Sequence, residues 1–255
     1  MIIVNPQADY STLGLGRAFA PITPEVEAIM ANYSVATDKM KGALSLFFAN
    51  IGGTIKAKIN SMFLPLFSST KSEAVFDIIS SSSKYPAAGN ANNLVFDNEN
   101  KLLGCNGVSP NWTQYTYSKS TLFGSSSLDG TYGVFAIIPN YAAADDIYSL
   151  CGGQFSKVDC AFCAMPADGL TKFRGIVFAD ISSKVGNVRN YVDRGVVARS
   201  GTYSFLNTND CWAFGGNHTE ISGSGVRILV CASGTTAYEE ATLRKAIIDL
   251  DNIFF

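Results

Sequence analysis

The spacing of apolar residues changes near Leu66, and this change constrains the fold more than any other feature of the sequence. Between Thr23 and Phe63, apolar residues recur at the intervals of three and four that are typical of a helix. Beyond Leu66, short runs rich in Val, Ile, Phe and Tyr alternate with clusters of Ser, Asn and Gly, as strands alternate with turns. The sequence therefore predicts an N-terminal helical segment, residues 1–66, followed by a β domain, residues 67–255.

Three short helices are expected in the N-terminal segment. Thr23 is a suitable N-cap for the first, because Pro24 then occupies the first turn, where its missing N–H is harmless. The second helix is expected to begin at Thr37 and to end at Gly52-Gly53. The third is expected over residues 55–63, with its apolar side chains on one face, and ends before a proline.

The β domain is expected to be an antiparallel sandwich, since short strand-like runs follow one another at the spacing of such folds. Asp97 to Asn100 are expected to form a hairpin loop, because Asn and Asp tolerate the backbone conformations of tight turns. The candidate strands are residues 74–79, 93–96, 101–104, 132–138, 147–151, 160–165, 174–180, 195–199, 211–215 and 226–232.

A last helix is expected at the C-terminus. Thr236 and Glu239 have the spacing of a capping box, and Leu243, Ile247 and Leu250 follow at helical intervals. The chain then ends in Phe254-Phe255, two aromatic residues that are poorly placed in water unless they pack on the sandwich or on another chain.

Composition limits the classes of partner. Hydrophobic residues make up 47% of the chain and charged residues 16%, with a net charge of −2 and no block of like charge. A chain of this kind folds, offers nucleic acid no basic surface, and suits a protein buried in an assembly. The N-terminal residues do not form the pattern of a signal peptide, and no apolar run reaches the length of a membrane span. The 6 cysteines are expected to be free thiols.

Several segments, taken in order, resemble one family. They are residues 40–48, residues 55–66, the strand-like run at 73–77, the aromatic-Gly-Gly strand end at 211–216, and the final strand and acidic helix at 226–230 and 239–250. This order is similar to that of structural proteins from phages and prophages of Bacteroidales-type hosts, which carry a concanavalin-like, laminin-G-like jelly roll. The resemblance covers most of residues 37–254 and depends on the order of loose motifs.

The resemblance implies a virion structural protein: a head fibre, tail fibre or decoration subunit that mediates attachment or assembly. It implies that the chain is not an enzyme and needs no cofactor or metal. The expected partners are further copies of the chain in a homotrimer, other virion proteins bound through the N-terminal segment, and a glycan of the host surface. Nucleic acid and membrane are not expected as partners.

The sequence contains a few residues of the types used in catalytic and metal sites, but it lacks the further residues that such sites require. His218 is the only histidine and has no recognisable nucleophile context, while the pair Cys160 and Cys163 lacks further ligands for zinc. No strand carries the alternating carboxylates of a glucanase, so a glycosidase is the least favoured reading. The loop from Asp97 to Asn100 offers oxygen ligands for calcium, but a hairpin turn needs the same residues.

One segment has the chemistry of a sugar-binding face. Trp112, Tyr115 and Tyr117 supply rings on which a sugar can stack, and Gln114 supplies an amide for its hydroxyls. The alternative is a partly buried strand with Trp112 in the core. A carbohydrate-binding module of the same fold is therefore the second expected function.

Overall fold

The computed structural model describes residues 20–84, 94–105, 116–118, 122, 131–137, 148–152, 162–164, 176–182, 187–192, 195–200, 210–213 and 226–255. Side chains are described for residues 20–84, 94–104, 122, 135, 137 and 226–255, and the remaining described residues are treated as backbone.

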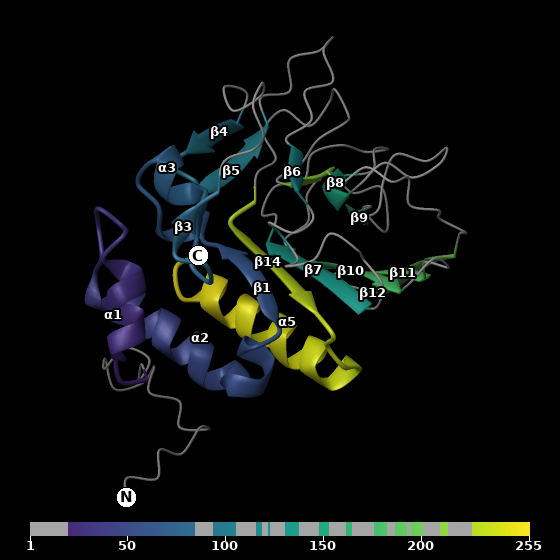
Figure 1. The fold of residues 1–255 in the computed structure, drawn as a ribbon, viewed down its shortest axis with the longest axis horizontal. Helices are drawn as coiled ribbons and strands as arrows, with labels where there is room; N and C mark the ends of the chain where they lie inside the picture. The colour runs from purple at the N-terminus through teal and green to yellow at the C-terminus, as the bar shows by residue number, and fades with distance from the viewer. Residues whose placement is uncertain are drawn as a thin grey trace, which may run out of the picture.

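The described strands form antiparallel sheets, and a few helices pack beside them (Figure 1). The largest sheet has six strands in the order β10-β7-β14-β1-β2-β3, and a second has four in the order β6-β13-β8-β9. The expectation of a mainly antiparallel β protein with helices near both ends is confirmed, and the arrangement is compatible with a sandwich. The strands of the large sheet are β1 (Ile59–Phe63), β2 (Phe76–Asp77), β3 (Ser82–Ser83), β7 (Thr131–Ile137), β10 (Ile176–Ser182) and β14 (Ile228–Ser233).

The remaining elements complete the described part of the chain. The helices are α1 (Pro24–Met30), α2 (Asp38–Lys56), the 3₁₀ turn η2 (Pro65–Phe67), α3 (Lys71–Ala74) and α5 (Ala237–Asn252). The four-stranded sheet contains β6 (Thr116–Ser118), β8 (Tyr148–Gly152), β9 (Phe162–Ala164) and β13 (Asp210–Ala213), and the paired strands outside it are β4 (Leu94–Asp97) with β5 (Leu102–Cys105) and β11 (Asn187–Val192) with β12 (Gly195–Ser200).

The prediction of a third helix over residues 55–63 is wrong, because residues 59–63 form β1. This strand pairs with β14 on one side and with β2 on the other, so that Phe63 lies opposite both Leu229 and Asp77. Ser61, Met62 and Phe63 are fully buried. A strand that is buried on both faces does not alternate apolar with polar residues, so its spacing cannot be told from that of a buried helix.

One hydrophobic core extends across position 66. It contains Leu44 and Phe47 of α2, Val230 of β14 and Ile247 of α5, together with Met62 of β1. Helices α2 and α5 lie side by side and cover one face of the large sheet (Figure 1). Among the described residues, the expected boundary at 66 therefore does not separate two cores, since the N-terminal helices belong to the packing of the sheet.

The predicted starts of three helices are borne out by the hydrogen bonds at their N-termini. The hydroxyls of Thr23, Thr37 and Thr236 accept hydrogen bonds from the backbone N–H groups that open α1, α2 and α5. Thr236 and Glu239 form the complete capping box. Gly52 interrupts α2 with φ 68° and ψ 171°, so the predicted stop is a kink, and one further helical turn follows it.

The strand predictions after residue 90 agree better with the structure than those before it. The hairpin at Asp97 is confirmed, because its carboxylate accepts the N–H groups of Glu99 at 2.9 Å and Asn100 at 3.1 Å. The strand predicted over residues 74–79 is reduced to β2, since α3 ends at Ala74. Strand β11 was not predicted.

The chain end packs on its own fold. Phe254 lies edge-on to Phe67 with the ring centroids 5.5 Å apart, and the Arg227 guanidinium lies 3.5 Å from the centroid of the Phe255 ring. Arg227 also donates to Asp251 at 3.0 Å, and these two side chains are only 7% and 2% exposed. A buried ion pair therefore joins the start of β14 to the last turn of α5.

Gly52→Ala is expected to lower the free energy of unfolding by about 1–3 kcal/mol, because φ 68° with ψ 171° lies in a region that essentially only glycine adopts. Gly53→Ala is the matched control, since a Cβ there meets nothing within 4 Å and its φ is not positive. The control is expected to be neutral or slightly stabilising. Urea unfolding of both variants measures the difference, and equal effects would contradict the assigned kink.

Arg227→Met is expected to lower the free energy of unfolding by about 3–5 kcal/mol, because it removes the guanidinium that donates to the buried Asp251 carboxylate. Lys245→Met removes one partner of an exposed pair, with Asp249, and is expected to cost about 0–1 kcal/mol. Thermal and urea unfolding compare the two variants. An equally small loss for both would show that the Arg227 pair is solvated.

Candidate functional site

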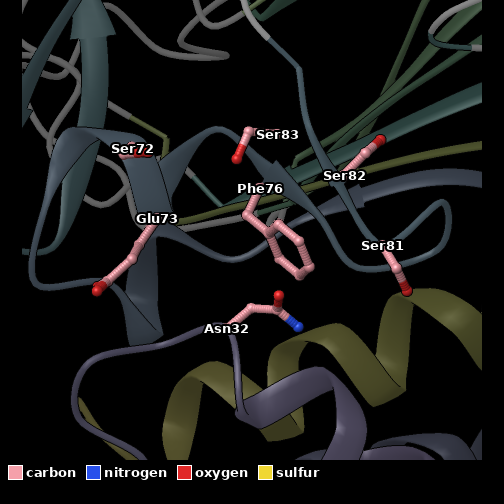
Figure 2. A pocket seen from close by; sticks show the side chains of 7 residues that line it. All are labelled: Asn32, Ser72, Glu73, Phe76, Ser81, Ser82 and Ser83. Atoms are coloured by element: carbon pink, nitrogen blue, oxygen red, sulfur yellow. The ribbon is translucent and has the colours of Figure 1, made fainter.

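A polar hollow of about 240 Å³ opens between three segments that are distant in the sequence. They are the loop after α1, helix α3 and the β2–β3 hairpin (Figure 2). The lining residues are mostly small and hydroxylic: Asn32, Ser72, Glu73, Phe76, Ser81, Ser82 and Ser83.

A buried aspartate fixes the hairpin that forms one wall of the hollow. One carboxylate oxygen of Asp77 accepts the N–H groups of Met62 at 2.9 Å and Ile79 at 3.1 Å. The other oxygen accepts the hydroxyl of Ser80 at 2.7 Å. Because these bonds tie the turn to β1, the backbone at Ser81 is held at φ 52°, a left-handed conformation that non-glycine residues adopt only at some cost. The turn therefore places a row of serine hydroxyls on the rim.

Phe76 forms the apolar part of the hollow. It is 5% exposed, and Tyr33 packs edge-on to it with the ring centroids 5.9 Å apart. Tyr33 packs in the same manner on Phe67 at 6.3 Å. This aromatic cluster fixes the position of the Phe76 ring, and Figure 2 shows the ring between the hairpin and Asn32.

Glu73 is held in place by backbone donors. Its two carboxylate oxygens accept the N–H of Ser34 at 2.9 Å and the N–H of Ser69 at 2.6 Å. Burial by itself raises the pKa of this carboxyl, but the hydrogen bonds from Ser69 and Ser34 outweigh burial and lower the pKa below its ordinary value of 4.5. Glu73 therefore connects the α1–α2 loop to α3 and carries a negative charge near neutral pH.

Asn32 presents an acceptor. Its side-chain N–H₂ group donates to the carbonyls of Ala28 at 3.0 Å and Ile29 at 3.1 Å, which orients the amide on the end of α1. The amide oxygen is turned toward the Phe76 ring (Figure 2). A side chain oriented by its own helix loses little conformational entropy when a ligand binds.

The hollow combines hydrogen-bonding groups of both kinds with one apolar surface. Serine hydroxyls donate and accept, the Asn32 oxygen accepts, and Phe76, which is 5% exposed, adds only a small apolar surface. Within the described ranges, no group of three or more His, Cys, Asp or Glu side chains is arranged to hold a metal ion. The hollow is therefore lined mainly by hydrogen-bonding groups.

A second hollow, of about 300 Å³, lies between the ends of α1 and α2 and the turn after β2. Its two charged residues, Lys56 and Glu25, form an ion pair with each other. The Lys56 ammonium also lies 4.4 Å from the centroid of the Phe48 ring. This hollow is lined by groups that already have partners.

The predicted sugar-binding residues are not described together. Trp112, Gln114 and Tyr115 lie outside the described residues, as do His218 and Cys160. Tyr117 belongs to β6, and its backbone lies opposite Cys211 of β13. For this residue the structure agrees with the alternative prediction, a strand. The sugar-binding interpretation of this segment stays a prediction.

Both carboxylate oxygens of Asp97, the strongest ligand in the candidate calcium site, accept hydrogen bonds within the hairpin. One carboxylate oxygen accepts two backbone N–H groups, and the other accepts the side-chain amide of Asn100 at 2.7 Å. The Asn98 oxygen accepts from Lys101 at 2.7 Å. These oxygens hold the hairpin together, which favours the turn over a cation site.

Sequence reasoning did not find the hollow. Asp77 followed by the run Ser80 to Ser83 is a turn signal, but Asp77 was included in the strand predicted over residues 74–79. Asn32 and Glu73 gave no signal that they would meet this turn, because their proximity depends on how α1 and α3 pack against β2.

No described helix combines the length and apolarity needed to cross a membrane. No protein-family model matches the chain, and no curated protein matches it either. Among solved structures, it is similar to a Trypanosoma rangeli sialidase in complex with a difluoro-KDN, with 13% identity and a TM-score of 0.48, over 77% of this chain and 33% of the sialidase. A complex of the same sialidase with 2,3-difluorosialic acid matches with 13% identity and a TM-score of 0.44, over 90% of this chain and 38% of the sialidase.

The expectation that the chain is not an enzyme is contradicted by this comparison, because the solved structures that it matches are enzymes. We therefore withdraw that expectation. The chain spans about a third of the length of the sialidases, and at 12–13% identity their activity is not transferred to it.

Glu73→Gln is expected to lower the free energy of unfolding at pH 7 by about 1–3 kcal/mol, because two hydrogen bonds lose their charged acceptor. Since the pKa of Glu73 is lowered in the folded protein, its stabilisation is present above pH 4.5 and is lost as the pH falls below that value. Wild type is therefore expected to lose more stability than the variant on acidification.

Urea unfolding at several pH values between 7 and about 3 checks this expectation. Glu27→Gln is the control, because Glu27 is 52% exposed in its pair with Lys41 and is expected to contribute little. Parallel stability curves for wild type and Glu73→Gln would contradict the role given to Glu73.

Proposed function

We propose that this chain is a structural protein of a bacteriophage particle, a head fibre, tail fibre or decoration subunit, which mediates attachment or assembly in the virion. The observation that carries the proposal is the order of elements between residues 37 and 254. Helix α2, strand β2, strand β13, strand β14 and helix α5 occur in the order of the segments that resemble phage structural proteins, whereas in the segment 55–66, expected to be helical, residues 59–63 form β1.

We propose further that the sheets form a concanavalin-like, laminin-G-like jelly roll. Antiparallel pairing throughout, and large-sheet neighbours that are distant in the sequence, such as β14 between β7 and β1, support this finer assignment. In this arrangement α2 and α5 cover the face of the six-stranded sheet that the second sheet leaves open.

Self-association into a homotrimer is part of the proposal. Ile22 and Val35, which flank α1, are 39% and 51% exposed, and the chain as a whole carries few charges. Exposed apolar side chains on the N-terminal side fit a contact with another copy or with another virion protein.

A second candidate function is that of a carbohydrate-binding module. The specific observation that favours it is the hydroxyl-lined hollow with Phe76 in its wall. Both functions are compatible, since a fibre or decoration subunit that binds a host glycan needs such a site.

The mass in solution tests the assembly role. Light scattering at several protein concentrations is expected to give three times the 27.2 kDa of one chain. Val35→Asp is expected to reduce that mass, because it places a charge in the proposed N-terminal contact. Val95→Asp is the matched control, as Val95 is 45% exposed on β4, away from α1, and is expected to leave the mass unchanged. A monomer at all concentrations would contradict the trimer.

A further inference from the structure

Helix α1 and the turn that follows it carry apolar residues on two opposite faces. The residues of the inner face are buried in the hydrophobic core: Val26, Ile29, Met30 and Tyr33. The residues of the outer face are exposed and recur at helical intervals: Pro24, Ala28, Ala31 and Val35. A helix at the surface of a single chain usually presents polar residues opposite its buried face. A second apolar face is instead the pattern of a helix that packs on both sides.

The outer face of α1 lies at the edge of the molecule. Figure 1 shows α1 at one side of the structure, with α2 on its inner side. Ile22 extends the outer face before the helix and is 39% exposed, and Val35 extends it after the helix and is 51% exposed. Exposed apolar residues that gather on one surface mark a contact with another molecule, whereas scattered ones do not.

The middle of the outer face is formed by small side chains. Ala28 and Ala31 end at Cβ, and both are exposed. The distance between two packed helices depends on the side chains at their contact, so small residues let the helix axes approach closely. The outer face therefore suits packing against another helix, with Ile22 and Val35 closing the contact at its two ends.

The charges beside the outer face are balanced. A helix turns by about 100° per residue, which places Glu25 on one flank of this face and Glu27 on the other. Glu25 pairs with Lys56 of α2, and Glu27 pairs with Lys41 of α2 at 2.7 Å. Each flank thus carries one acid and one base, and the two glutamates are 53% and 52% exposed. Two copies of this face can meet without net repulsion and can exchange ion-pair partners, which favours another copy of the chain as the occupant.

The short length of α1 favours a ring of copies over a single pair. The helix has 7 residues and is therefore about 10 Å long. The outer face of so short a helix cannot by itself supply the ~800 Å² that each partner buries in a stable pair. Around a symmetry axis the same face contacts two neighbours, so that a closed ring buries it from both sides.

We propose that copies of this chain associate by packing the outer faces of α1 against one another around a symmetry axis. Ala28 and Ala31 form the centre of this contact, and Ile22 and Val35 form its ends. The inference rests on the homotrimer of the proposed function, and it names the surface through which the copies meet.

Three variants of the full chain test this contact. Ala28→Glu and Ala28→Lys place a charge at the centre of the outer face, and both new residues are good helix formers at an exposed position, so the fold is kept. Ala241→Glu is the matched control, because it makes the same change at an exposed position of α5. Urea unfolding checks that the three variants keep the stability of the wild type.

Light scattering over a range of concentrations measures the association of each variant. Ala28→Glu and Ala28→Lys are each expected to weaken association by at least about 100-fold, because like charges then face each other around the axis. An equimolar mixture of these two variants is expected to recover much of the mass, since opposite charges meet in mixed assemblies. Ala241→Glu is expected to associate as the wild type does.

The opposite results overturn the inference in distinguishable ways. A trimeric wild type whose mass neither Ala28 variant reduces would place the contact elsewhere, which keeps the proposed assembly role and rejects this surface. Loss of association that the mixture does not restore would show that the outer face meets a different surface of the neighbour. A wild type that associates only after deletion of residues 1–19 would show that this segment of the same chain covers the face. A monomer with and without that segment would reject both the inference and the homotrimer, and would leave the face to a different protein.

Discussion

The pairing of β1 with β14 brings together residues 59–63 and 228–233, which lie near opposite ends of the described chain. Once these strands pair, β7 adds to the other edge of β14, and β2 adds to β1. The face of this sheet that α2 and α5 cover then holds the side chains of one core, from Val26 to Leu250. Such long-range pairing is entropically costly to close, and the burial of apolar surface against the two helices offsets that cost.

Buried charged groups determine how the remaining elements attach to this core. Asp77 binds the turn after β2 to the backbone of β1, and Glu73 joins the α1–α2 loop to the segment before α3. Arg227 and Asp251 lock the end of α5 to the start of β14. Because a buried polar group without its partner is destabilising, each of these residues specifies one arrangement of its neighbours. The hollow is a consequence of two of them, Glu73 and Asp77, which hold opposite walls.

This origin gives the hollow a physical character that suits recognition. Its walls are fixed before any ligand arrives, because the hairpin is anchored by Asp77 and the Phe76 ring by Tyr33. A preformed site loses less conformational entropy on binding than a flexible loop does. The same residues that stabilise the junction between the helices and the sheet thus orient the groups that line the hollow.

The sequence by itself determined the elements whose signals are local. Thr23, Thr37 and Thr236 cap their helices because a side-chain oxygen meets an N–H only a few residues away, and Asp97 shapes its hairpin in the same way. Only the tertiary structure decided that residues 59–63 are a strand, because their helical spacing is equally that of a strand that is buried on both faces, and this strand is paired at its two edges with β14 and β2. It also decided the hollow, since Asn32, Glu73 and Ser81 come from three segments that meet only through packing. Local hydrogen bonds can be predicted from neighbouring residues, whereas burial and proximity depend on partners that are distant in the chain.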